Sequence, residues 1–320
     1  MTSLRISALD IALTAIFAAL SWIVSEFVPG IPIIGASGSR ISFDAALAPI
    51  YGILIGPYLG FLAALIGGLV AAGSLFTILT SFCTGISAFV AGMLVTRKAG
   101  VGKILPGWGF SAIAVALLIV GWYSTEIGRQ APFYPILQGI GLLAILTTRG
   151  WIADKIEEKR KEETLSPVKW FDSQALTWGV ICLTLGITCY FTYLDLVSIS
   201  EGSNILGMLP FFAYSMLVIG AFSIIYGFFS WIRPGFVTAV ALACYCGIIA
   251  DHMLGNLIFI GMIEVVAPGL TDVPDLFMIV LPVSVAERSL FTAIAATIAV
   301  ALLSTLRRAG ITYRKTQKTS

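Results

Sequence analysis

The side chains with potential chemistry stand out because they interrupt long apolar runs. Seven of them lie within or directly beside such runs and are the candidates for binding a ligand: Arg40, Asp44, Asp251, His252, Asn256, Glu287 and Arg288. A charge near hydrocarbon costs at least a few kcal/mol unless it is paired or hydrated. A group of such residues in one protein therefore predicts a functional site.

Two interpretations of these residues remain open. His252 and Asn256 are four residues apart, which places them on one helical face, and Arg40 would reach Asp44 by the same spacing if that segment were helical. The first interpretation is polar recognition of a bound organic molecule. The second is that the arginines and the carboxylates form structural ion pairs.

The sequence does not favour a metal site or an enzyme. His252 is the only histidine, and its side chain points about 100° away from that of the adjacent Asp251 on a helix. No G-x-S-x-G or H-E-x-x-H motif is found, and AGVGKI at 99–104 lacks the first Gly and the final Ser or Thr of a phosphate-binding loop. We therefore expect no catalytic residues, no metal and no cofactor in this chain.

Composition identifies the elements that must position these residues. The chain has 320 residues, of which 58% are hydrophobic and 11% charged, and its mean hydropathy is +0.98. A soluble fold cannot remove that much apolar surface from water. We predict an all-α polytopic membrane protein, in contact with lipid and without a nucleic-acid partner.

About ten transmembrane helices are expected. Apolar segments bounded by Pro, Gly or charge fall at 8–28, 44–55, 57–73, 76–96, 107–124, 132–148, 173–193, 206–231, 235–260 and 281–306. The strongly charged linker at 149–172 separates the first six from the last four. No internal repeat is found.

The distribution of basic residues predicts that both termini are cytoplasmic. With ten spans, sixteen of the nineteen Lys and Arg residues lie inside. The six ionisable candidate residues, together with Glu26 at the end of the first span, all fall in the outer half of the membrane. A competing topology that fuses 44–73 into one span has an equal charge bias. Pro57 disfavours helix at Gly56, which favours a tight turn between two short spans over one kinked span.

A stripe of small residues marks the first span. Its members follow at spacings of four, three and four and are Ala8, Ala12, Ala15 and Ala19. That spacing places them along one helical face, and such faces let helices approach closely in lipid.

Three stretches resemble the S component, the substrate-binding subunit, of energy-coupling factor (ECF) vitamin transporters. They are ISFDAALAPIYGILIGPYLGFLAALIGG at 41–68, SLFTILTSFCTGISAFVAGMLV at 74–95 and IVLPVSVAERSLFTAIAATIAVALLSTL at 279–306. The resemblance implies a six-helix core made of the first four spans and the last two, with the final helix opening at Pro282. The domains would be 1–98, an inserted four-span region at 99–233, and 234–320 with a basic tail.

The resemblance also implies a function. The alanine face would dock on a transmembrane coupling subunit, and two cytoplasmic ATPase subunits would use ATP on behalf of this chain. A small, water-soluble, vitamin-like nutrient would bind at high affinity among the seven candidate residues, beneath a gating loop at 30–43. The protein would lie in the cell membrane. The alternatives are a self-sufficient ion-coupled secondary transporter, which usually shows internal repeats, and an intramembrane enzyme that uses Asp251 and His252 as an acid–base pair.

Overall fold

The structure, a computed structural model, describes residues 7–28, 30–32, 40–99, 105–157 and 234–308, together with scattered helical positions between 177 and 224. The described helices are α1 (Ala8–Phe27), α2 (Asp44–Ile55), α3 (Pro57–Ala71), α4 (Leu75–Leu94), α5 (Gly107–Ser124), α6 (Glu126–Gln130), α7 (Ile136–Thr148), α8 (Trp151–Glu157), α11 (Pro234–Gly261), α12 (Ile263–Val266) and α13 (Val273–Arg308). Two-residue strands β1 (Ile31–Pro32) and β2 (Arg40–Ile41) pair antiparallel, as do β3 (Lys98–Ala99) and β4 (Leu105–Pro106).

Five of these helices, α1, α4, α5, α11 and α13, are long and apolar enough to cross a membrane. The pair α7 and α8, which is bent by 68°, makes a sixth if it is one span, and α2 and α3 are shorter apolar helices. An all-α membrane protein is thus confirmed. The number of about ten spans stays a prediction, because the expected spans at 173–193 and 206–231 fall largely outside the described residues.

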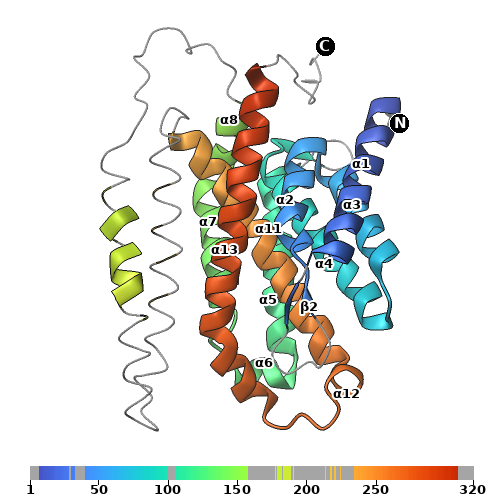
Figure 1. The fold of residues 1–320 in the computed structure, drawn as a ribbon, viewed down its shortest axis with the longest axis vertical. Helices are drawn as coiled ribbons and strands as arrows, with labels where there is room; N and C mark the ends of the chain where they lie inside the picture. Colours follow the sequence, from blue (N-terminus) through green and yellow to red (C-terminus); the bar gives the residue numbers. More distant parts are fainter. Residues whose placement is uncertain are drawn as a thin grey trace.

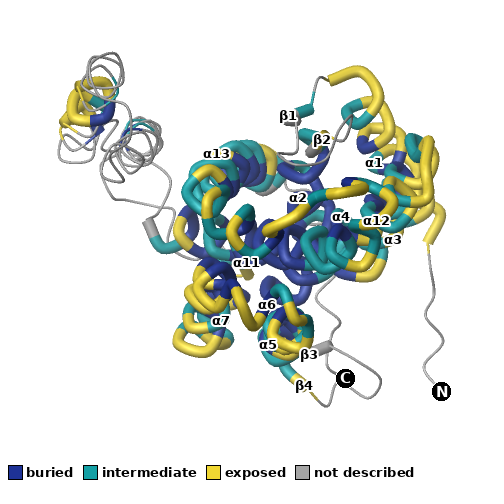
Figure 2. The backbone as a smooth tube through the Cα atoms, turned by 90° about the horizontal axis from the view of Figure 1, so that it is seen from below, coloured by how far each residue is buried: buried dark blue, intermediate teal, exposed yellow. Residues whose placement is uncertain are grey.

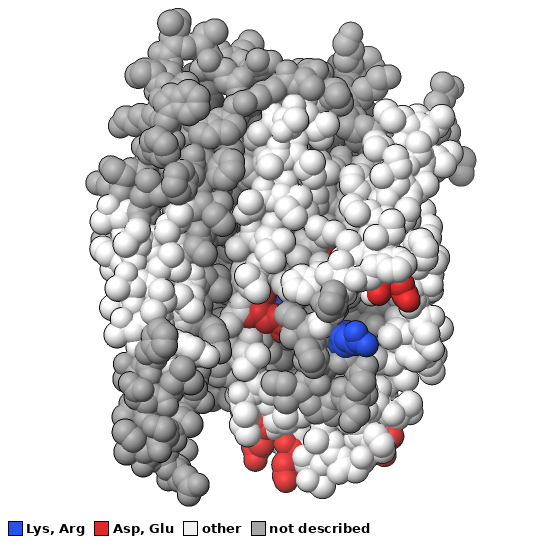
Figure 3. Space-filling view, viewed as in Figure 1, with Lys and Arg blue, Asp and Glu red and all other residues white. Residues whose placement is uncertain are grey.

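The two ends of the bundle are formed by different elements (Figure 1). The start of α1, α8 and the end of α13 lie at the upper end, whereas β2, α6 and α12 lie at the lower end. On the face shown in Figure 3, most of the described surface is uncharged, and the described charges gather at mid-height and at the lower end. This distribution suits a protein whose sides contact lipid.

The core lies where α2, α4 and α11 meet (Figure 2). α11 is mostly buried and also contacts α13, α7 and α8, whereas α1 is mostly exposed and packs on α3 and α2. α5 and α7 pack on each other and against α11. The bundle therefore surrounds α11, which carries three of the seven candidate residues.

The stretch 44–71 forms a helical hairpin. Gly56 has φ 95°, a conformation that favours glycine, and it separates α2 from α3. A Cβ atom added to Gly60 would lie 2.6 Å from the Cα of Gly52, and one on Gly92 of α4 would lie 2.7 Å from the Cα of Pro57. The predicted tight turn with closely packed glycines is confirmed, and a fused span across 44–73 is excluded.

The expected start of the last helix was wrong. α13 begins at Val273 rather than near 281, and Pro282 lies inside it. Pro274 occupies the first turn, where a missing N–H is tolerated, and the N–H of Leu276 already donates to the carbonyl of Asp272. A proline in an apolar run was therefore a poor marker of where this helix begins.

We predict that Gly52→Ala strongly destabilises the protein. The added methyl group would collide with the backbone carbonyl of Ala88 on α4, which cannot move as a side chain can. Overpacking of this kind costs roughly 1–3 kcal/mol or more. Thermal unfolding in detergent should show a clearly lower midpoint than that of Gly73→Ala, because nothing lies near the Cβ position of Gly73. Equal midpoints for the two variants would contradict the close contact of α2 and α4.

Candidate functional site

A cavity of about 1020 Å³ lies among α1, α2, α4, α11, α13 and β2. Its volume is at the upper end of the range usual for small-molecule sites, roughly 300–1,000 Å³. The walls combine aromatic side chains, such as Phe259 and Phe277, with buried polar groups. These are the features of a ligand-binding pocket.

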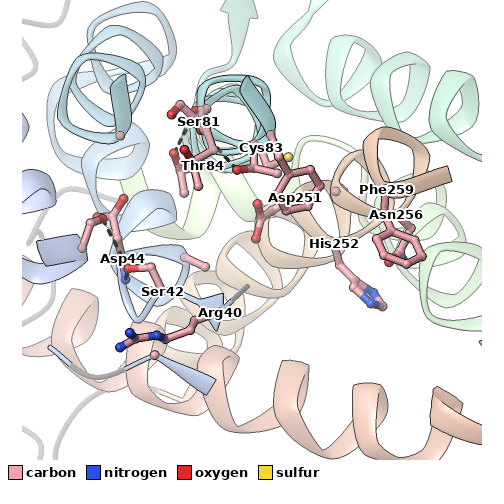
Figure 4. Close-up of a pocket in the computed structure, with 18 of the residues that line it drawn as sticks. Arg40, Ser42, Asp44, Ser81, Cys83, Thr84, Asp251, His252, Asn256 and Phe259 are labelled. Carbon is pink, nitrogen blue, oxygen red and sulfur yellow. Dashed lines mark hydrogen bonds between the residues drawn. The ribbon is translucent and has the colours of Figure 1, made fainter. Parts of the chain in front are cut away.

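All seven candidate residues line this one cavity. In the close-up, Arg40 and Asp44 approach from one wall, and Asp251, His252 and Asn256 come from α11 (Figure 4). The remaining two, Glu287 and Arg288, belong to α13. The fold thus brings together residues that are more than 200 positions apart in sequence, and their role in binding stays a prediction.

Asp44 is held by neutral donors rather than by Arg40. Arg40 lies in a strand, so the helical spacing that would have joined it to Asp44 does not apply. The hydroxyl of Ser21 donates to Asp44 Oδ2 at 2.7 Å, and that of Tyr51 donates to Oδ1 at 3.2 Å. Nor does the carboxylate cap α2, since Ser42 Oγ accepts the Asp44 N–H instead. Asp44 therefore ties α1 to α2 at the edge of the cavity.

Arg288 is shared between two carboxylates. Its Nη1 lies 3.8 Å from Asp251 Oδ2 and its Nη2 lies 3.5 Å from Glu287 Oε2, and all three side chains are at least nine-tenths buried. Its guanidinium also lies 5.5 Å from the ring centre of Phe291. The distances from Arg288 to the two carboxylates, 3.8 and 3.5 Å, exceed the 2.7–2.9 Å of a strong charged hydrogen bond. Arg288 thus forms ion pairs with Asp251 and Glu287, but both pairs are long.

Three buried polar atoms of this cluster have no hydrogen-bond partner within the described part of the chain. They are Asn256 Nδ2, Glu287 Oε1 and Arg288 Nε. Leaving a buried donor or acceptor unpaired costs roughly 1–3 kcal/mol, and more for a charged group. All three residues line the cavity, so the unsatisfied polar atoms gather at its wall.

The ring of His252 is held by residues that precede or belong to α7. Tyr134 Oη lies 3.1 Å from Nε2, and Gln138 Nε2 lies 3.5 Å from Nδ1. The Gln138 amide nitrogen also donates to the carbonyl of Ile249, so it faces Nδ1 as a donor. Nδ1 must then be the acceptor, which places the proton of a neutral ring on Nε2.

Tyr134 is a cavity residue that sequence reasoning missed. It lies in the region predicted to be an insertion, yet it lines the cavity. Its ring stacks on Trp122 with ring centres 4.9 Å apart and meets Phe277 edge-on at 4.8 Å. No spacing in the sequence relates residue 134 to residue 252, so only the fold could reveal this contact.

The described residues contain no group of three His, Cys, Asp or Glu side chains that could hold a metal ion. The neighbours Asp251 and His252 have different partners, since Asp251 faces Arg288 and His252 faces Tyr134. The two side chains therefore do not converge on one point.

The alanine stripe of the first helix lies on the surface. Its four members, Ala8, Ala12, Ala15 and Ala19, are all exposed, while a different side of α1 buries Thr14, Ala18 and Ser21. The stripe is therefore not used for packing within the described part of the chain.

Residues 5–148 match the family described as "ECF-type riboflavin transporter, S component". The resemblance to ECF S components is confirmed. A protein of Methanocaldococcus jannaschii, described as uncharacterized, is 29% identical over 197 residues, which cover 59% of this chain and 61% of the relative. The chain thus spans less than two thirds of that relative's length. No solved structure matches the chain.

The S-component match does not coincide with the predicted core. It continues through α5 and α7, which were assigned to an insertion, and it ends before α11 and α13, which were assigned to the core. Five of the seven candidate residues lie on α11 and α13. The cavity is therefore built jointly by the matched S-component segment and by helices outside it.

We predict that Tyr51→Phe lowers the stability of the protein. The buried carboxylate of Asp44 would lose one of its two hydrogen bonds, which at a charged group is worth roughly 1.5–3 kcal/mol. Tyr58→Phe is the matched control, because Tyr58 is 54% exposed. Thermal unfolding should show a lower midpoint for Tyr51→Phe alone. An unchanged midpoint would show that the Tyr51 contact does not support Asp44.

Proposed function

We propose that this chain is the membrane-embedded binding subunit for uptake of a small, water-soluble, vitamin-like nutrient. Partner subunits supply the energy: a transmembrane coupling protein and two cytoplasmic ATPases. The observation that carries the proposal is the polar cavity, lined by all seven candidate residues, in a chain whose first part matches the S components. The chain itself acts as a binding protein and not as an enzyme.

The charges at the two ends of the bundle support an outward-facing cavity. At the upper end, Arg97 pairs with Asp154 at 2.8 Å and with Glu157 at 2.9 Å, and Arg149 and Lys155 lie in the same region. Cytoplasmic loops carry an excess of Lys and Arg. The upper end, where α1 starts and α13 ends, is then cytoplasmic in the cell membrane, and the cavity in the lower part receives nutrient from outside.

The surface of α1 supports docking on a coupling subunit. The exposed alanine stripe offers a flat face on which another transmembrane helix can pack closely, since small residues permit close backbone approach in lipid. The sequence also lacks a phosphate-binding loop, so ATP must be used by other chains. ATP is accordingly a cofactor of the partners and not of this subunit.

Riboflavin is the first ligand to test, because the matching family is described as a riboflavin transporter component. However, the residues of α11 and α13 that line the cavity lie outside the matched segment. The substrate is therefore proposed at the level of the vitamin class.

We predict that Ala15→Trp abolishes uptake by the assembled transporter but leaves nutrient binding intact. The indole ring would hold the coupling subunit away from α1, and Ala15 is not among the residues that line the cavity. Uptake in cells and binding to the purified chain should be measured in parallel. Ile16→Trp is the control, because Ile16 is 60% exposed and lies about 100° around the helix. Equal loss of uptake and binding in Ala15→Trp would argue against a docking face.

We predict that Asp251→Ala combined with His252→Ala weakens nutrient binding at least tenfold. The pair contributes two polar walls of the cavity, and removal of Asp251 also frees Arg288 from one of its carboxylates. Isothermal titration of the purified chain with the vitamin that it binds most tightly tests this, and Asp275→Ala, an exposed residue outside the cavity, is the control. Unchanged affinity would show that both residues have a structural role and do not contribute to binding. Uptake by vesicles that contain this chain alone would instead favour a secondary transporter.

A further inference from the structure

The described walls of the cavity carry more negative than positive charge. Four carboxylates line it, those of Glu26, Asp44, Asp251 and Glu287, against two guanidinium groups, those of Arg40 and Arg288. His252 adds no charge, because its contacts with Gln138 and Tyr134 fit the neutral ring. The described lining of the cavity thus holds more acidic than basic side chains within an apolar bundle.

The excess is greatest in the buried part of the cavity. Arg40 is exposed, which leaves Arg288 as the buried cation among the described lining residues. Arg288 faces two carboxylates at once, and Asp44 is held by hydroxyl groups, with no ion pair to another described residue. Unbalanced charge in a desolvated site is costly, because charged groups lose their hydration there and like charges repel one another with little screening.

The unpartnered atoms indicate which groups a ligand must present. Glu287 has a side chain that is 10% exposed, and its free Oε1 requires a hydrogen-bond donor. Arg288, whose side chain is 4% exposed, has a free Nε that requires an acceptor, as does Asn256 Nδ2. A ligand that satisfies this cluster therefore combines at least one N–H or O–H donor with nearby acceptor atoms.

We infer that the substrate is a nitrogen-containing ring compound that carries a positive charge at neutral pH. Its positively charged group lies near Glu287 and Asp251 and restores charge balance around Arg288. An N–H or O–H group of the same molecule donates to Glu287, and its acceptor atoms receive hydrogen bonds from Asn256 and Arg288. The aromatic rings of Tyr134 and Phe277 in the cavity wall favour such a cation further. This inference rests on the proposed function and narrows its substrate class, since riboflavin is uncharged and would leave the imbalance in place.

A panel of vitamins that differ in charge tests the inference. Binding to the purified full-length chain is measured by isothermal titration with thiamine and pyridoxamine as cations, pyridoxine and riboflavin without an added cationic group, and pantothenate as an anion. Pyridoxamine and pyridoxine are a matched pair, because an aminomethyl group in one replaces a hydroxymethyl group in the other. We expect a cation to bind most tightly, and pyridoxamine to bind at least tenfold more tightly than pyridoxine.

Glu287→Gln provides a second readout that does not depend on overall stability. The variant keeps the shape of the side chain and removes its charge, so the ratio of pyridoxamine to pyridoxine affinity should fall at least fivefold. Asp275→Asn, an exposed carboxylate outside the cavity, should leave that ratio unchanged. An unchanged ratio in Glu287→Gln would overturn the inference.

The possible outcomes separate this inference from the proposed function. Tightest binding of riboflavin, pyridoxine or pantothenate would overturn the cationic substrate and leave a vitamin-binding subunit standing. Failure of every vitamin to bind, in a chain that is folded by its unfolding midpoint, would overturn both.

Discussion

The burial of Arg288 is the constraint on which much of the structure depends. A guanidinium group inside an apolar bundle is stable only with compensating charge, and here Asp251 on α11 and Glu287 on α13 provide it. The requirement brings α11 and α13 side by side at the level of the cavity. The same pairs are long and leave the Nε of Arg288 unpartnered within the described residues, so the cluster supports the fold without satisfying all of its own polar atoms.

The other side of the cavity depends on close backbone packing. Gly52, Gly60 and Gly92 let α2, α3 and α4 approach so closely that no side chain fits between them. In lipid, where the hydrophobic effect does not drive helices together, such contact supplies dispersion energy instead. The hairpin then presents Asp44 at the cavity edge, where Ser21 of α1 and Tyr51 of α2 hold its carboxylate. A rigid scaffold of this kind fixes the wall that faces the charged cluster.

The match to the S components covers only part of the residues that build the cavity. The S-component match ends at residue 148, and yet α11 lies at the centre of the bundle and contacts α4 and α2. The polar groups of α11 and α13 thus meet a scaffold that is S-component-like.

The sequence by itself determined the membrane class, the helical hairpin at Gly56-Pro57 and seven of the residues that line the cavity. These follow from local physics: apolar runs must leave water, proline disfavours helix before it, and charges in apolar segments require a partner. The tertiary structure decided what spacing along the chain does not encode. It directed Asp44 to Ser21 and Tyr51 instead of Arg40, it started α13 before Pro282, and it placed Tyr134 against His252. Each of these depends on contacts between distant segments, and such contacts exist only once the helices have packed.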